Sequence, residues 1–363
     1  MGRAADVIVV GGGIIGCAVA RELARRGAAV RLFEWRTVGG GATHASAGVL
    51  APYIEGHHES TLCDLGVRSL ALYDDFVATA SEESGIAVEY RRSGTLEVAV
   101  DVATASQLQE RARKHEMTEW LDGATARQLE PSLGESIAGG LFVANHGYVA
   151  AGTLTEALAW AAMRHGAELE TGHRVAEVRA SSDGAVVVTD DGTPWTSGDV
   201  VVCAGSWLSA MRLGSVAPSR NVRPIRGQLL RLAWQGSPLN RVIWGSTCYI
   251  VPWRGGMVLV GATVEDVGFD ERTTAAGVRD LLDAVCELLP EAWRATFLEA
   301  RAGLRPATTD GLPIIGRSTH SRHITYATGH YRNGVLLAPL TAQLIGDLLL
   351  DNVADPALDA LKP

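Results

Sequence analysis

Three glycines and one carboxylate near the N-terminus have the spacing of a dinucleotide-binding site. Gly11, Gly13 and Gly16 form a G-x-G-x-x-G turn, and Glu34 lies 21 residues after Gly13. Such glycines let backbone N–H groups approach a pyrophosphate at a helix N-terminus, and an acid at this distance accepts hydrogen bonds from a ribose. An acid in place of arginine also argues against a 2′-phosphate on that ribose. The alternative is a βαβ unit without a nucleotide, which the complete order of strand, turn, helix, strand and acid disfavours.

A second segment that can bind phosphate, residues 35–52, follows directly. Amides and hydroxyls in a run of small residues can lie close against an extended ligand and bind phosphates. The alternative is a flexible glycine loop, which is the less favoured interpretation even for the segment alone, and the position after the βαβ unit disfavours it further. The small residues are Gly39, Gly40, Gly41, Ala42, Thr43, Ala45, Ser46, Ala47 and Gly48.

The elements that must position these residues are strongly patterned. An apolar run at 7–10 predicts a buried parallel strand, and a second strand is expected at 30–33. The amphipathic helix between them ends at Gly27, in a left-handed conformation. The run at 200–205 repeats this logic, so we place it in the same parallel sheet. A strand at 324–328, a turn at Gly329 and a helix to Leu350 are expected to return to this sheet.

The remaining segments predict helices and short strands around this unit. Helices are expected at 61–84, 104–116 and 153–165, the last one capped by Thr153 and ended by Gly166. Strands are expected at 88–90, 94–100, 141–143, 168–170 and 174–178, with turns at 183–184 and 190–192. After residue 223 the pattern becomes antiparallel, with strands at 227–232, 248–252 and 257–261 and a helix at 275–288.

These patterns predict an α/β fold, α+β overall, with two domains. A discontinuous Rossmann-like nucleotide-binding domain takes residues 1–85, 142–220 and 301–363, and an antiparallel-sheet substrate domain takes 86–141 and 221–300. The 363 residues are enough for two domains with large cores. A net charge of −9 argues against nucleic-acid binding, since no basic footprint is present.

The same sequence features indicate a cytoplasmic protein. The first strand begins at Asp6, so a cleavable signal peptide is not expected. The longest apolar tract, 334–350, is interrupted by Pro339 and Asp347 and is not expected to span a membrane. Five scattered cysteines without a C-x-x-C pair suit reduced thiols better than disulfides or a metal site.

Six motifs together resemble the flavin-dependent D-amino-acid oxidase family, and most closely its glycine-oxidase branch of the thiamine-biosynthesis type. The last two are the most specific, and all six occur in the family's order along nearly the whole chain. They are the glycine turn at 7–16, ASAGVLAP at 45–52, VVCAGSW at 201–207, CYIVP at 248–252, AGLRPATTDGLPIIG at 302–316 and GHYRNGVLLAP at 329–339.

The resemblance implies non-covalent FAD as the cofactor, held by named positions of this chain. The glycine turn would bind the pyrophosphate, Glu34 the adenosine ribose and the Val175 backbone the adenine. Amides of the segment that starts at Arg332 would face the flavin N1/C2=O edge, where reduction places negative charge. The full set implied is Gly11, Gly13, Ile14, Ile15, Gly16, Glu34, Thr43, Ala45, Ser46, Gly48, Val49, Leu50, Val175, Ala204, Gly205, Arg305, Arg332, Asn333, Gly334, Val335 and Leu336.

The resemblance also implies a carboxylate-binding substrate site. Arg305 matches the family's carboxylate-binding arginine, Tyr249 the tyrosine that shares that carboxylate, and Arg332 an active-site arginine of the glycine-oxidase branch. Arginine binds a carboxylate through two parallel hydrogen bonds, which lysine cannot do. The alternatives are a surface salt bridge for each arginine and a core tyrosine for Tyr249. His330 and Tyr331 are expected only as pocket walls.

The implied chemistry is oxidative deamination of glycine or another small amine such as sarcosine or D-alanine. A hydride would pass from Cα to flavin N5, O₂ would reoxidise the flavin to give H₂O₂, and the imine would hydrolyse to a 2-oxo acid and ammonia. One alternative is a dehydrogenase of the same fold, acting on D-amino or proline-like imino acids and reducing a quinone or carrier. Another is a flavoprotein without catalysis. The expected partners are the small substrate, O₂ and further copies of the chain, as a dimer or tetramer.

Three positions depart from relatives of the family. A covalent flavin tether would need a late cysteine or a histidine at position 45, but no cysteine follows Cys286 and residue 45 is Ala45, with His44 beside it. The glycine-oxidase branch often has other residues at the positions of Arg301 and Val264. The preferred amine and the roles of His44, Arg301 and Val264 therefore stay open.

Overall fold

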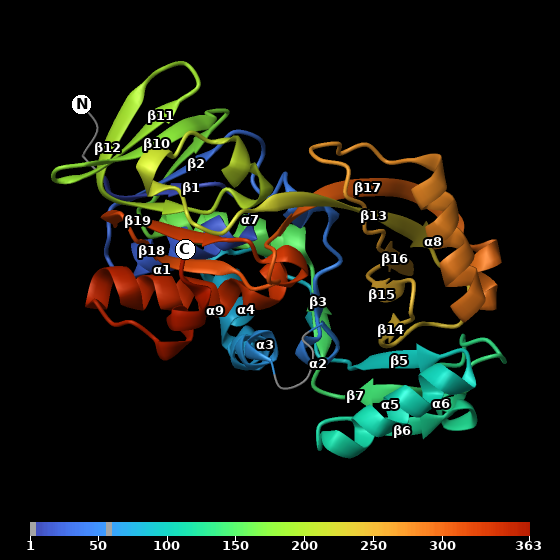
Figure 1. Ribbon diagram of the computed structural model, residues 1–363. Helices are drawn as coiled ribbons and strands as arrows, with labels where there is room; N and C mark the ends of the chain where they lie inside the picture. The colour runs from blue at the N-terminus through green and yellow to red at the C-terminus, as the bar shows by residue number, and fades with distance from the viewer. Residues whose placement is uncertain (1–4, 56–59) are drawn as a thin grey trace.

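Strands and helices divide between two lobes of a computed structural model, which describes residues 5–55 and 60–363 (Figure 1). The first lobe contains an eight-stranded sheet with the order β10-β11-β12-β1-β2-β9, to which β19 and β18 are added at β12. Strands β12, β1, β2 and β9 run parallel, and β19 is parallel to β12. The strands are β1 (Ala5–Val10), β2 (Val30–Glu34), β9 (Glu168–Thr171), β10 (Val175–Ser181), β11 (Gly184–Thr189), β12 (Pro194–Val202), β18 (Ile314–Ser318) and β19 (Ser321–Thr328).

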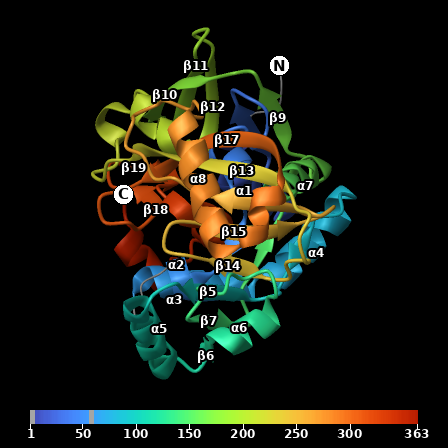
Figure 2. The same cartoon turned by 90° about the vertical axis from the view of Figure 1, so that its right-hand side faces the viewer.

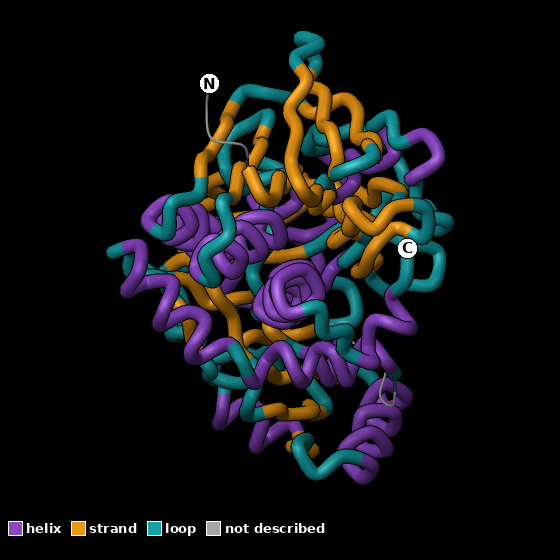
Figure 3. Tube along the Cα trace, turned by 90° about the vertical axis from the view of Figure 1, so that its left-hand side faces the viewer, coloured by secondary structure: helices purple, strands orange, loops and turns teal. Residues whose placement is uncertain are grey.

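Five helices belong to this lobe, and α1 and α9 contact the strands of its sheet. In α1 the residues Ile15, Val19 and Leu23 are buried against the core, as their fourfold spacing predicts. α1 contacts both α7 and α9, and Figure 3 shows the helices beneath the strands at the top of the view. The helices are α1 (Ile14–Arg25), α3 (Thr61–Ala71), α4 (Tyr73–Ser84), α7 (Ala151–Arg164) and α9 (Gly334–Gly346).

The second lobe contains another eight-stranded sheet, with the order β17-β13-β16-β15-β14-β5-β7-β6. Helix α8 (Ala275–Leu288) lies across its strands, and α5 (Val102–Lys114) and α6 (Gly123–Leu129) pack near β7 (Figure 2). The strands are β5 (Thr95–Ala99), β6 (Glu119–Asp122), β7 (Gly139–Val143), β13 (Arg223–Ala233), β14 (Val242–Trp244), β15 (Tyr249–Trp253), β16 (Met257–Gly261) and β17 (Thr296–Ala307).

The second sheet is antiparallel except where β14 meets β5, which run parallel. The three strands predicted after residue 223, now part of β13, β15 and β16, do pair antiparallel, and the β14–β5 pair is an exception that was not predicted. The two strands belong to separate excursions of the chain, so no hairpin connection determines their relative direction.

A three-stranded sheet joins the lobes, with the order β3-β8-β4. Its strands are β3 (Val49–Leu50), β8 (Gly147–Val149) and β4 (Tyr90–Arg91), and the short α2 (Pro52–Glu55) follows β3. Short 3₁₀ helices and a π-helical segment complete the chain. They are η1 (Ala42–Ala45), η2 (Gly205–Ala210), η3 (Gly214–Val216), η4 (Pro290–Arg294), η5 (Tyr331–Asn333), the π-type η6 (Asp347–Asp351) and η7 (Pro356–Leu361).

Three predicted elements differ from the structure. The helix expected at 61–84 is two helices, because Leu72 ends α3 and begins α4. Its φ of −85° and ψ of −12° are nearly helical, so the apolar period continues through the junction and conceals it. Helix α7 begins at Ala151 after Ala150, so Thr153 is not its cap. The strand expected at 88–90 is reduced to Tyr90–Arg91.

The apolar C-terminal segment is the one helix in the described part of the chain that is long and apolar enough to cross a membrane. It comprises Tyr331–Asp351, and 72% of its 18-residue window is buried inside the protein. Helix α9 within it packs against α1 and α3. This burial is typical of a core helix, for which apolarity on all sides is expected.

The two sheets extend slightly past the predicted domain limits. β7 continues to Val143 and β17 to Ala307, both in the second sheet. The domain boundaries themselves stay a prediction.

Candidate active site

One cavity runs between the two large sheets, and residues from both line it. Its walls include the turn after β1, the end of β2, η1, the start of β10, η2, β17, β15 and the start of α9. The cavity therefore extends from Glu34 and Val175 past Gly13 and Thr43 to Tyr249 and Arg305. This elongated lining suits an extended ligand rather than a compact one.

The glycine turn brings backbone to the cavity wall where a side chain would obstruct it. Gly11 has φ +108°, and a Cβ there would lie 2.5 Å from the carbonyl oxygen of Cys203. A Cβ on Gly16 would overlap the carbonyl oxygen of Gly11, so this glycine permits close packing of α1 on β1. Gly13 begins α1 without a capping side chain and lines the cavity. The helix N-terminus at the cavity is the arrangement that binds phosphate.

Glu34 is buried at the end of β2 and both of its oxygens already accept backbone hydrogen bonds. Oε2 accepts from the Gly12 N–H at 2.7 Å and Oε1 from the Arg36 N–H at 2.7 Å. Each carboxylate oxygen has a second lone-pair position, so these bonds orient the group without exhausting its acceptors. Glu34 lines the cavity, and its predicted role toward a ribose stays a prediction.

An aromatic and cationic cluster beside Glu34 was missed by the sequence reasoning. The Arg36 guanidinium lies 4.3 Å from the Trp35 ring centre and 4.7 Å from that of Trp207. Arg36 also forms an ion pair with Glu271 at 2.6 Å, which joins the first lobe to the segment between β16 and α8. The available signal was the Trp-Arg pair directly after Glu34.

The segment at η1 packs tightly against β17. A Cβ on Gly303 would lie 2.8 Å from the Ala45 Cβ, so the glycine lets β17 approach this segment closely. His44 is exposed and does not line the cavity, and its carbonyl accepts a hydrogen bond from Arg301 at 3.3 Å. Val264 is 58% exposed. His44, Arg301 and Val264 therefore all lie outside the cavity wall.

Arg305 and Tyr249 come together on this wall from two strands of the second sheet. Arg305 Nη1 donates to the Thr263 carbonyl at 2.9 Å, and it forms no ion pair with any residue the structure describes. Burial raises the pKa of Tyr249, and the nearby Arg305 charge opposes that rise. A Cβ on Gly227 would overlap the Arg305 guanidinium, and one on Gly261 would overlap the Tyr249 hydroxyl group. Two glycines on neighbouring strands thus make the space for these two side chains.

Arg332 has a carboxylate partner, which distinguishes it from Arg305. Its Nε lies 3.1 Å from Oε2 of Glu55, and its guanidinium is 5.7 Å from the Trp244 ring centre. Burial raises the pKa of Glu55, while the charges of Arg332 and Arg305 oppose that rise. Glu55 lines the cavity but was not among the predicted residues. It follows the ASAGVLAP motif by three residues, which is the signal that was available.

The predicted cofactor residues divide into those on the cavity wall and those behind it. Leu50 and Leu336 are fully buried in the core of the first lobe, and the Leu336 carbonyl accepts from Ser69 Oγ at 2.6 Å. His330 and Tyr331 line the wall as expected. Those not on the wall are Gly16, Leu50, Asn333 and Leu336; those on it are Gly11, Gly13, Ile14, Ile15, Glu34, Thr43, Ala45, Ser46, Gly48, Val49, Val175, Ala204, Gly205, Arg305, Arg332, Gly334 and Val335.

His330 is neutral because it is buried. Its pKa falls to about 3, and Nε2 lies 3.1 Å from Oγ1 of Thr341. A neutral imidazole leaves the positive charge of this end of the cavity to the arginines.

These walls fit FAD. Glycine backbone and the N-terminus of α1 offer donors to a pyrophosphate, and the same cavity continues past Thr43 to Arg305. Gly334 and Val335 place the start of α9 on the same cavity, where its N–H groups can face a charged ring edge.

Comparisons with known proteins agree with this geometry. Glycine oxidase of Geobacillus kaustophilus is 36% identical over 355 residues, 95% of this chain and 92% of that protein. The crystal structure of glycine oxidase from Geobacillus kaustophilus has a TM-score of 0.93 at 35% identity, covering 98% of this chain and 96% of that one. The bifunctional protein ThiO/ThiG of Nostoc sp. is 36% identical over 359 residues, 97% of this chain and 54% of that protein. The family model DAO, FAD dependent oxidoreductase, matches residues 6–348, so this chain belongs to the DAO family of FAD-dependent oxidoreductases.

Proposed function

We propose that this chain is an amine oxidase that acts on small α-amino acids, with glycine first and sarcosine and D-alanine as further substrates. The observation that carries the proposal is the state of Arg305. Its guanidinium lies on the cavity wall, is held on one side by main-chain oxygen, and has no carboxylate partner among the described residues. A guanidinium that is held in place and has no carboxylate partner can bind the carboxylate of an incoming substrate.

The substrate carboxylate would bind Arg305 and the Tyr249 hydroxyl together. Both line the cavity, from strands β15 and β17 of one sheet, and desolvation raises the pKa of the Tyr249 hydroxyl, so it stays protonated. The hydroxyl can therefore donate to a carboxylate oxygen while the guanidinium fork binds it.

Arg332 would have a different role. Because Glu55 neutralises it, it does not compete with Arg305 for the carboxylate. The pair forms part of the wall beside the substrate, and the Trp244 ring lies against both Arg332 and Tyr249. We therefore assign Arg332 and Glu55 to shaping the pocket and place the charge recognition at Arg305.

Bound FAD would supply the two-electron chemistry and pass the electrons to O₂, which yields H₂O₂. The residues of the chain would place the substrate Cα–H, keep water away from it and retain the carboxylate during the reaction. The released imine would hydrolyse to glyoxylate and ammonia when glycine is the substrate. A role in thiamine synthesis agrees with the ThiO part of the bifunctional relatives' names.

An anaerobic reduction screen tests this proposal. Glycine, sarcosine and D-alanine should bleach the visible flavin absorption of the purified holoenzyme, and with air present each should yield H₂O₂. L-Proline and a carboxylate-free amine such as ethylamine serve as contrasts. Bleaching by L-proline without peroxide from glycine would refute the oxidase and favour a dehydrogenase.

The cytoplasmic location and the homo-oligomer expected from the sequence remain proposals. Light scattering during size-exclusion chromatography measures the molar mass in solution. A mass equal to one chain, 38.3 kDa, would contradict the oligomer.

A further inference from the structure

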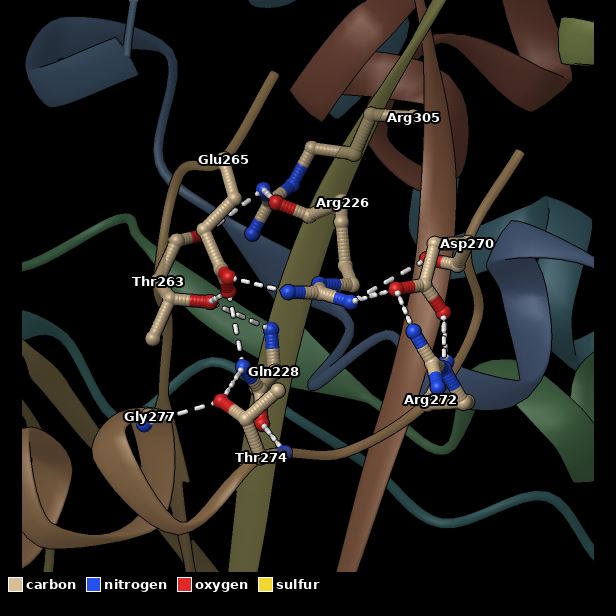
Figure 4. A network of polar contacts seen from close by, with 9 residues as sticks. All are labelled: Arg226, Gln228, Thr263, Glu265, Asp270, Arg272, Thr274, Gly277 and Arg305. Carbon is tan, nitrogen blue, oxygen red and sulfur yellow. Dashed lines mark hydrogen bonds and ion pairs between the residues drawn. The ribbon is translucent and has the colours of Figure 1, made fainter. Parts of the chain in front are cut away.

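The segment that connects β16 to α8, residues 262–274, is fixed to β13 by a polar cluster (Figure 4). At its centre is Arg226, which is only 4% exposed and forms ion pairs with Glu265 and with Asp270 at 2.9 Å. The backbones of the same residues are also bonded, since the Arg226 N–H donates to the Glu265 carbonyl at 2.8 Å and the Glu265 N–H to the Arg226 carbonyl at 3.0 Å. Side chain and backbone thus hold this segment at one register.

Gln228, two residues along β13, adds a second attachment. Its Nε2 donates to Glu265 Oε1 at 2.8 Å and to Thr274 Oγ1 at 2.9 Å, and its Oε1 accepts from the Thr274 N–H at 2.8 Å. Its backbone N–H donates to Thr263 Oγ1 at 2.8 Å, and that hydroxyl donates to Glu265 at 2.6 Å. The buried amide therefore ties both ends of the segment to the strand.

This cluster contacts the substrate-binding arginine through two carbonyl oxygens. Arg305 Nη1 donates to the Thr263 carbonyl at 2.9 Å and to the Arg226 carbonyl at 3.4 Å. Both acceptors belong to residues that the cluster holds, as Figure 4 shows. Gly227 directly follows Arg226 on β13, and its missing side chain lets the guanidinium rest directly on the strand.

We propose that the side chains of Arg226, Gln228, Thr263 and Glu265 are positioning groups that hold Arg305 in the orientation in which it receives the substrate carboxylate. The inference rests on the proposed function of Arg305. The four side chains act on it through the Thr263 and Arg226 carbonyls and lie outside the cavity wall.

Two physical effects follow from this arrangement. A guanidinium has many rotamers, so fixing one nitrogen on rigid carbonyls reduces the entropy lost when the carboxylate binds. The second effect concerns Glu265, because it is the carboxylate in this cluster that could neutralise Arg305. Because Arg226, Gln228 and Thr263 all donate to it, Glu265 remains turned toward them, and Arg305 stays available for the substrate.

Acetate binding to the FAD-loaded enzyme measures this effect directly, because acetate presents a carboxylate without an oxidisable amine. The change in the visible flavin spectrum and isothermal titration calorimetry give its Kd. We expect Glu265→Gln and the milder Thr263→Val to weaken acetate binding on the order of tenfold, as loss of supporting residues weakens other preorganised sites. With glycine, KM should rise by a similar factor, while the limiting rate of anaerobic flavin reduction stays within about twofold.

Asp266→Asn is the matched control. Asp266 is the next residue in the same segment, its side chain is 60% exposed, and it pairs with the exposed Arg223 outside the cluster. This variant should bind acetate as the wild type does. If it loses as much affinity as Glu265→Gln, the effect belongs to the whole segment and the positioning inference is wrong.

An Arg305→Ala arm separates the two proposals. If Arg305→Ala binds acetate as tightly as the wild type, the proposed carboxylate site is wrong. If Arg305→Ala loses binding while Glu265→Gln and Thr263→Val keep wild-type affinity, the carboxylate site stands and the positioning inference is overturned. Thermal unfolding of each variant with FAD bound shows that the comparison is made on folded protein, and Thr263→Val decides the question if Glu265→Gln does not fold.

Discussion

Replacement of Arg305 by alanine should weaken glycine turnover through KM. The variant removes the guanidinium fork that we expect to bind the carboxylate. Truncating one partner of a buried, hydrogen-bonded charge pair costs about 2–5 kcal/mol. Arg305 is only partly buried, and its Nη1 is already engaged by the Thr263 carbonyl, so the lower part of this range applies. About 2–3 kcal/mol corresponds to a roughly 30- to 150-fold fall in kcat/KM.

Stopped-flow reduction of the flavin without O₂ separates binding from chemistry in this variant. The apparent Kd for glycine should carry most of the loss, and ethylamine, which lacks a carboxylate, should be affected little. Arg301→Ala is the control, because Arg301 lies on the same strand, pairs with Glu299 and is outside the cavity wall. Its effect should stay within about 0.5 kcal/mol, or twofold. An unchanged glycine Kd in Arg305→Ala would refute the assignment.

Three further predictions concern neighbours of the site. Tyr249→Phe should raise the glycine KM about tenfold by removing one hydrogen bond to a charged group, and equal KM values for the two proteins would contradict this. Burial lowers the pKa of His330 and His146 from 6.5 to about 3, so the unfolded chain binds more protons between these values and stability falls with acidification. Each of the two histidines should lower the free energy of unfolding by about 2 kcal/mol at pH 5. His330→Gln should therefore flatten the dependence of Tm on pH; an unchanged slope would argue against the lowered pKa of His330. Gly227→Ala should displace the carboxylate-binding guanidinium and raise the glycine KM. Gly152→Ala is the control, because open space surrounds Gly152, and it should only raise Tm slightly. Similar KM effects in both variants would contradict the role assigned to Gly227.

The elements that local pattern determines were predicted well from the sequence. The run at 7–10 is buried in β1, and 200–202 pairs with it in the same parallel sheet, as expected. Helix 275–288 has the predicted bounds because Thr274 caps it and its apolar period is regular. In these segments each residue's burial repeats with the period of its own element, so the information is local.

The contacts that build the substrate site depend on pairing between distant strands. Arg305 rests on Gly227 only because β17 pairs with β13 in a register that aligns Arg305 with Ile225 and Gly303 with Gly227. A shift of one residue would turn Arg305 to the other face of the sheet. The partner of Arg332 is likewise 277 residues away at Glu55. Periodicity contains no information about such registers, and the motif resemblance identified Arg305 and Arg332 without their partners.

The geometry of strand β17 limits which amino acids can react, according to the distance between their amine-bearing carbon and their carboxylate. Gly303 lies against Ala45 of the segment expected to line the flavin, the Leu304 carbonyl accepts from Ser206 Oγ at 2.8 Å, and Arg305 anchors the carboxylate. Gly303 and Arg305 lie on the same face of one strand, about 6.6 Å apart. The separation between flavin wall and carboxylate anchor is therefore set by covalent geometry, and larger or smaller pocket residues leave it unchanged. Enlarging the pocket would admit longer side chains on Cα, while β-alanine, whose amine-bearing carbon is one methylene further from its carboxylate, would stay out of register with the oxidising centre.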